Sequence, residues 1–179
     1  MSSDLLKAIT HKLEALNIKP TAQVLHVSIE RQELVVFANG RETRRFQVST
    51  SKSPPNCEEN SFGTPTGLHR IESKIGDGAT VGTLFKGRVD IKKNYDELSK
   101  EERKPNLITS RILWLTGLEP GNNQGSGHDS YERYIYIHGT NHEDKIGKPS
   151  SGGCILLRNK EMIELFDRVS TGEFVFISQ

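Results

Sequence analysis

The sequence predicts a mainly β fold of the α+β class, built as an antiparallel β sandwich or partly open barrel with helices on its outside. Three observations lead to this prediction. Beyond residue 21 the apolar segments are short, and many alternate with polar residues as strands do. Glycines and prolines, 16 and 7 among 179 residues, separate these segments. Helical periodicity occurs only near the two ends of the chain.

The first element is a helix. Apolar residues at spacings of three and four predict an amphipathic helix over residues 2–17, and Pro20 ends it. We therefore expect residues 1–20 to form a helix packed on a single main domain, residues 21–179, which is long enough to bury its own core.

Strands follow, and one more helix comes late. Alternation and apolar runs predict strands over residues 22–29, 34–37, 44–50, 68–75, 83–92, 107–118, 134–137, 155–157 and 173–178. Asn39-Gly40 favours a two-residue hairpin turn. Asn159 is expected to cap the second helix, and Gly172 to end it. Residues 95–103 are expected to form a short polar helix or a lid-like loop.

Charge and composition exclude several classes of protein. Lys plus Arg number 24 and Asp plus Glu 23, a balance that argues against non-specific nucleic-acid binding. No apolar run approaches the roughly 18 residues of a membrane span. The glycine-rich loop at residues 76–82 lacks phosphate-loop spacing, and we expect no cofactor. The charged start predicts a cytoplasmic protein, or a periplasmic or cell-wall protein if a leader has been removed. The oligomeric state stays open.

One stretch carries the chemistry. The strand predicted over residues 134–137 runs into His138-Gly139, and a polar loop then leads to Ser150-Ser151-Gly152-Gly153-Cys154. An apolar run follows directly, so a histidine leaves one strand and a cysteine begins another. If those strands pair, the imidazole of His138 can take the proton of the Cys154 thiol, which is the arrangement a cysteine nucleophile needs.

The turn before Cys154 could also stabilise an oxyanion. Gly152 and Gly153 allow the backbone to approach a ligand closely and to aim successive N–H groups at one point. The second cysteine, Cys57, is followed by two glutamates, which should disfavour its thiolate. We therefore expect Cys154 to be the nucleophile, although a disulfide between the two cysteines is an alternative in an oxidising compartment.

Two other interpretations compete. Cys154 could be an inert buried thiol, since free cysteine often packs as a small apolar side chain. His138 and His142 could form a metal site with Cys154, but metal-binding pairs at that spacing sit on a helix, and Gly139 argues against one. We therefore expect no metal. The other histidines are interpreted as surface or loop residues: His11, His26, His69 and His128.

These motifs resemble the L,D-transpeptidases, the family with the YkuD-like catalytic domain. The family pattern is a strand ending in His-Gly and a Ser-x-Gly-Cys turn followed by an apolar run, which residues 134–139 and 151–155 match. Residues 64–67, Thr-Pro-Thr-Gly, are similar to a supporting TPxG turn of the family. The resemblance covers roughly residues 22–178.

The resemblance implies an activity on peptidoglycan stem peptides or muropeptides. Cys154 would attack the L-centre carbonyl of meso-diaminopimelate and release D-alanine, leaving a thioester; carbapenem-type β-lactams acylate this cysteine in the family. His138 would be general base and acid, oriented by the Gly139 carbonyl, with N–H groups of Gly153 and Cys154 as the oxyanion hole. The residues expected to contact substrate are Tyr136, Ser150, Ser151, Gly152 and Arg158.

The chain departs from the family at two positions. Gly152 stands where many members have histidine, and Leu156 where many have an arginine that could anchor a substrate carboxylate; Arg158 or Arg133 could replace it. A cytoplasmic protein favours water as acceptor, hence an L,D-carboxypeptidase of muropeptide recycling. The alternatives are an exported L,D-transpeptidase that forms cross-links and a non-catalytic peptidoglycan-binding module.

Overall fold

A computed structural model describes residues 2–179, with side chains from residue 4 onward. The main elements are α1 (Ser2–Ala15), β1 (Gln23–Ser28), β2 (Glu33–Ala38), β3 (Arg41–Gln47), β4 (Gly67–Ile75), β5 (Thr83–Lys86), β6 (Val89–Asn94), η1 (Tyr95–Glu97), β7 (Ile108–Gly117), β8 (Tyr136–Gly139), η2 (Glu143–Lys145), β9 (Ile155–Leu157), α2 (Asn159–Arg168) and β10 (Phe174–Ser178). Within the described residues, no helix is both long and apolar enough to cross a membrane.

The strands form one open sheet, which confirms the mainly β prediction. Its order is β3-β2-β1-β10-β4-β7-β5-β6, and β8 and β9 branch from β7. The recorded strand pairings are antiparallel except those of β1 with β10 and of β8 with β9. The sheet is therefore mixed: β10, the last strand, lies parallel to β1, and β8 lies parallel to β9.

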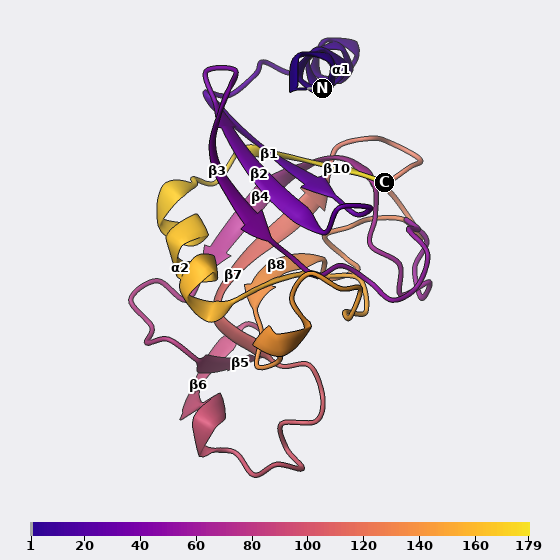
Figure 1. Ribbon diagram of the computed structural model, residues 1–179. Coiled ribbons are helices and arrows are strands. Elements are labelled where there is room, and N and C mark those ends of the chain that lie inside the picture. The colour runs from indigo at the N-terminus through magenta and orange to yellow at the C-terminus, as the bar shows by residue number, and fades with distance from the viewer. Residues whose placement is uncertain (1) are drawn as a thin grey trace.

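Helices α1 and α2, which lie well apart in Figure 1, pack on opposite faces of this sheet. Successive side chains of a strand point to opposite faces, and β10 uses both. Phe174 and Phe176 pack with Ile9 and the rest of the α1 stripe. Val175 and Ile177 face the main core, to which α2 contributes three apolar side chains, Met162, Leu165 and Phe166. β10 therefore contributes side chains to both hydrophobic clusters, one on each face of the sheet.

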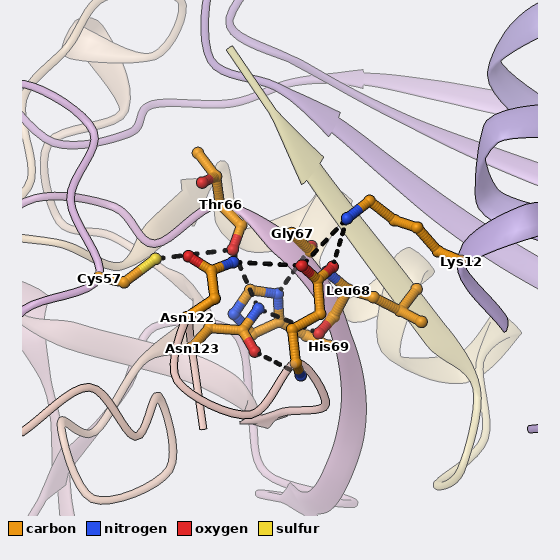
Figure 2. Close-up of polar contacts among 9 residues, drawn as sticks. Lys12, Cys57, Thr66, Gly67, Leu68, His69, Asn122 and Asn123 are labelled. Carbon is orange, nitrogen blue, oxygen red and sulfur yellow. Dashed lines mark hydrogen bonds and ion pairs between the residues drawn. The ribbon is translucent and has the colours of Figure 1, made fainter. Parts of the chain in front are cut away.

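A polar network fastens α1 to the loop after β7 (Figure 2). Lys12 Nζ lies 3.0 Å from both carboxylate oxygens of Glu119. Glu119 Oε1 also accepts the Leu68 N–H at 2.7 Å, and its own N–H donates to Asn123 Oδ1. Asn123 in turn donates to the carbonyls of Thr66 and Leu68. The network ties α1 to the start of β4. The boundary at residue 20 stays a prediction.

His69 is not the surface or loop residue that we expected. Its side chain is fully buried in β4, beside this network. Nδ1 lies 3.1 Å from the Gly67 carbonyl oxygen, and Nε2 lies 2.9 Å from Ser130 Oγ. Burial lowers the pKa of His69 to about 4, so the ring is neutral at pH 7.

Three local predictions were wrong. Residues 83–92 form two strands, β5 and β6, joined by a Gly87-Arg88 turn in which both residues have positive φ. Asn159 does not cap α2 but is its first residue, and its side chain is buried. The site strand begins at Tyr136, because the backbone at Tyr134 has a φ of 56° and is not extended.

Candidate active site

The parallel pair β8 and β9 brings the two parts of the motif together. Ile137 pairs with Ile155 and His138 with Leu156, so Cys154 stands at the entrance to β9 opposite Tyr136. The Tyr136 N–H points to Cys154 Sγ at 3.4 Å, and the thiol donates to the Tyr134 carbonyl at 3.5 Å. The cysteine sulfur is therefore held by main-chain groups at the start of β8.

Cys154 and His138 project from the same face of the sheet. Side chains of paired residues share a face, and so do those of residues two apart on one strand. Tyr136 is opposite Cys154 and two residues before His138, and its ring lies 6.4 Å from the His138 ring in an edge-on arrangement. Among the described residues, no hydrogen bond joins the His138 ring to Cys154. A hydrogen bond between thiol and imidazole would therefore require a change in the position of one of the two side chains.

The orientation of His138 is set by its neighbour. His138 Nδ1 lies 2.8 Å from the Gly139 carbonyl oxygen. A carbonyl only accepts hydrogen bonds, so Nδ1 carries the proton in the neutral ring and Nε2 keeps its lone pair. The ring is 2% exposed. This arrangement leaves Nε2 as the basic nitrogen.

Asn159 fixes the backbone that carries His138. The hydroxyls of Thr109 and Ser110 on β7 both donate to Asn159 Oδ1 at 2.6 Å, and Asn159 Nδ2 donates to the Thr140 carbonyl at 2.9 Å. A Cβ at Gly139 would lie 2.7 Å from Asn159 Oδ1, so only glycine fits there. Sequence reasoning missed this role, because an asparagine at a helix start matches the capping pattern.

The turn before Cys154 is closed by Ser151. Its hydroxyl donates to the Cys154 carbonyl at 2.6 Å and accepts the Gly153 N–H at 3.2 Å. Gly153 has a φ of 128°, a conformation that favours glycine. Gly152 is exposed, and a Cβ built on it would meet nothing within 4 Å. Ser151 is thus engaged within the turn, while Gly152 leaves open space beside the thiol.

These bonds bear on the expected oxyanion hole. The Gly153 N–H is engaged with Ser151, whereas the Cys154 N–H makes no hydrogen bond to another described residue. An oxyanion beside the sulfur could therefore accept a hydrogen bond from the Cys154 N–H directly. It could accept one from the Gly153 N–H only if the hydrogen bond between Gly153 and Ser151 breaks. The oxyanion hole stays a prediction.

The resting thiol and imidazole are both neutral. Burial raises the pKa of the Cys154 thiol to about 11, against the lowering effects of the Tyr136 N–H and the Arg133 charge. Burial also lowers the pKa of His138 to about 4, although the Gly139 carbonyl opposes this shift. At pH 7 the protein holds a protonated thiol and an uncharged base, so no thiolate–imidazolium pair is formed in advance.

Two other predicted contact residues, Ser150 and Arg158, make no hydrogen bond to Cys154 within the described chain. Ser150 Oγ is buried without a hydrogen-bond partner among the described residues. Arg158 precedes α2, and its guanidinium lies 3.4 Å from Glu161 and from Gln47. His142 Nε2 lies 3.0 Å from the Lys104 carbonyl, at the far end of β8. Within residues 2–179, no three or more His, Cys, Asp and Glu side chains gather as metal ligands would.

An aromatic cluster beside Cys154 went unrecognised in the sequence. Trp114 stacks on Tyr131 at 3.9 Å between ring centroids and meets Tyr136 edge-on at 5.6 Å. Cys154 packs against this cluster. The Arg88 guanidinium lies 4.6 Å from the Trp114 ring centroid and donates to Tyr136 Oη at 3.1 Å. A cation therefore faces the same cluster as the thiol.

The fold and this site define a mixed, mainly β protein with a cysteine and a histidine on one face of adjacent parallel strands. The family model for the L,D-transpeptidase catalytic domain, YkuD, matches residues 22–177. The chain therefore belongs to the L,D-transpeptidase family. A curated protein, YqjB of Bacillus subtilis (strain 168), is 45% identical over 46 residues, a segment covering 26% of each chain.

Solved structures have the same fold. An L,D-transpeptidase from Mycobacterium smegmatis aligns with a TM-score of 0.55 at 16% identity, over 88% of this chain and 59% of that one. L,D-transpeptidase 3 from Mycobacterium tuberculosis, in complex with a faropenem-derived adduct, gives 0.55 at 15% identity over 88% and 60%. A Xylanimonas cellulosilytica L,D-transpeptidase gives 0.53 at 17% over 89% and 62%. The chain thus spans about three fifths of these proteins.

Proposed function

We propose that the chain is a cysteine acyl-transferase that cleaves the L,D bond between meso-diaminopimelate and D-alanine in peptidoglycan tetrapeptide stems. The observation that carries the proposal is the common face of Cys154 and His138, with the His138 Nδ1–H directed to the Gly139 carbonyl. The family match over residues 22–177 supports the same assignment.

In the first half of the proposed reaction, sulfur replaces nitrogen on the substrate carbonyl. The Cys154 sulfur bonds to the carbonyl carbon as His138 Nε2 takes the thiol proton. The oxyanion that forms accepts the Cys154 N–H. The carbon–nitrogen bond then breaks, and the imidazolium returns its proton to the leaving amine of D-alanine. A thioester on Cys154 and neutral His138 remain.

In the second half, we propose water as the favoured acceptor, which makes the protein an L,D-carboxypeptidase of the kind that muropeptide recycling requires. His138 takes a proton from water as its oxygen adds to the thioester carbonyl. Collapse of the adduct expels the Cys154 sulfur, which recovers the proton. The product is a tripeptide with a new carboxyl group.

An amine acceptor is the second candidate, and one observation favours it. A groove of about 320 Å³ runs beside Gly152 and is lined by Tyr134, Glu59 and Glu132, among others. Two carboxylates at this groove would attract an ammonium group from a second stem peptide. After losing a proton, that amine could resolve the thioester and form a cross-link.

The test is incubation of the protein with purified tetrapeptide, followed by mass spectrometry. A tripeptide product supports hydrolysis, whereas dimers or exchange of the terminal D-amino acid support transpeptidation. Cys154→Ala should abolish both, and Cys57→Ala is the matched control that should retain full activity. If Cys154→Ala keeps the activity, the proposed mechanism is wrong. If tetrapeptide binds but no product forms, the protein is a binding module.

A further inference from the structure

One cation on the aromatic cluster that packs against Cys154 has no structural partner of opposite charge among the described residues. Arg88 follows β5 in the Gly87-Arg88 turn, and its half-buried guanidinium lies against the rings of Trp114 and Tyr134, 4.6 and 5.0 Å from their centroids. Its one side-chain hydrogen bond within the described chain goes to Tyr136 Oη. No described carboxylate lies within ion-pair distance of it, so several of its five N–H donors stay free.

The other arginines considered for a substrate carboxylate are already occupied. Arg133 donates to three backbone carbonyls and one hydroxyl of residues 56–63, at 2.8 to 3.3 Å. Arg158 is paired with Glu161. Leu156 stands where many family members have arginine, and it is 1% exposed, packed within the sheet. Of these three arginines, Arg88 is the one whose guanidinium keeps several donors available for an anion.

Tyr136 contacts both the Cys154 sulfur and Arg88. Its N–H points to Cys154 Sγ, and its hydroxyl, at the other end of the side chain, meets Arg88. In an L,D-tetrapeptide, the attacked carbon would lie about 3 to 3.5 Å from the sulfur. The terminal carboxyl carbon follows only three bonds further, within about 4 Å of that carbon. The leaving residue could thus extend along Tyr136 with its carboxylate toward Arg88.

We propose that Arg88 binds the terminal carboxylate of the leaving D-amino acid and so selects substrates that end one residue after the scissile bond. This inference rests on the proposed function. Arginine suits the role because its planar fork pairs with a carboxylate through two parallel hydrogen bonds. Stacking on Trp114 and Tyr134 orients that fork before substrate arrives. Arg88 is then a specificity-determining residue.

Binding can be tested without turnover. In the Cys154→Ala protein, the fluorescence of Trp114, the chain's one tryptophan, should report titration with tetrapeptide as the free acid or as its terminal amide. The acid should bind about 10- to 100-fold more tightly, as a charge-assisted hydrogen bond implies. Adding Arg88→Met should weaken the acid to the level of the amide and leave the amide unchanged. Arg88→Lys should recover part of the difference.

Lys86→Met is the matched control, since Lys86 is an exposed cation on the same hairpin and should not alter the acid-to-amide ratio. Equal binding of acid and amide, or a ratio that survives Arg88→Met, overturns the role of Arg88. Absence of binding by either peptide overturns it as well. The wild-type protein could fail to cleave tetrapeptide although the acid-to-amide affinity ratio depends on Arg88. In that case the proposed reaction is wrong, and Arg88 is still the carboxylate site.

Discussion

Alkylation of Cys154 is expected to be slow at pH 7 and to accelerate about tenfold for each pH unit up to about pH 10. The experiment uses the Cys57→Ala protein, in which Cys154 is the remaining one of two thiols. Iodoacetamide reacts with the thiolate and carries no charge, so its rate reports the thiolate fraction. The mass of the intact protein gives the extent of alkylation at each time and pH.

The magnitude follows from the burial of the thiol. The pKa of Cys154 rises from the ordinary value of 9.0 to about 11, so at pH 7 roughly one thiol in 10,000 is ionised. In the unfolded chain the fraction is roughly one in 100. The denatured protein should therefore react about 100-fold faster than the folded one at pH 7, and the difference should close between pH 9 and 11.

The His138→Ala variant distinguishes a neutral thiol and imidazole from a thiolate–imidazolium pair. A neutral imidazole contributes no charge that could stabilise a thiolate, so alkylation at pH 7 should change less than about twofold while turnover is lost. A rate that reaches a plateau near pH 6 and falls in His138→Ala would show a preformed thiolate–imidazolium pair, and it would refute the reasoning from burial.

Four further outcomes are expected. Asn159→Ala removes the acceptor of the buried Thr109 and Ser110 hydroxyls and the donor to the Thr140 carbonyl, and should lower the free energy of unfolding by about 3 kcal/mol, measured by urea denaturation. Ser150→Ala removes a buried hydroxyl without a partner and should leave that free energy unchanged or slightly higher. Gly152→His enters open space and should change it by less than about 0.5 kcal/mol. Between pH 6.5 and about 4, His69 and His138 bind protons in the unfolded chain but not in the folded protein, where both are buried. Lowering the pH over this range should therefore reduce the free energy of unfolding by about 3 kcal/mol for each histidine, seen as a lower urea midpoint.

Local patterns predicted most strands but not how all of them pair. Asn39-Gly40 marked the hairpin between β2 and β3, and both residues do have positive φ. The Gly87-Arg88 turn was missed, because arginine rarely adopts the positive φ of 69° that it has here. The parallel pairing of β1 with β10 joins the two ends of the chain. Such contacts depend on tertiary packing, which period-two alternation does not encode.

In the site, too, the residues marked by their sequence neighbours could be predicted, and those that act through tertiary contacts could not. His138 and Cys154 could be placed near each other, because glycines and apolar runs mark their strand ends. The part played by Asn159 could not be read, since it depends on contacts with β7 and with the end of β8. Arg88 belongs to no motif and reaches the aromatic cluster only because β5 of its hairpin pairs with β7. Both His69 and His138 are buried, a property that the residue type alone does not indicate.

The neutral resting pair limits how the proposed reaction can begin. Because burial raises the pKa of Cys154 to about 11 and lowers the pKa of His138 to about 4, the thiolate–imidazolium pair is a minor state before substrate binds. Proton transfer must therefore accompany attack on the carbonyl, when the charge moves from sulfur to an oxyanion with hydrogen-bond donors. Only a correctly placed substrate permits this step. A carboxylate held by Arg88 would supply that placement, so the contact that selects the substrate would also determine when the thiol reacts.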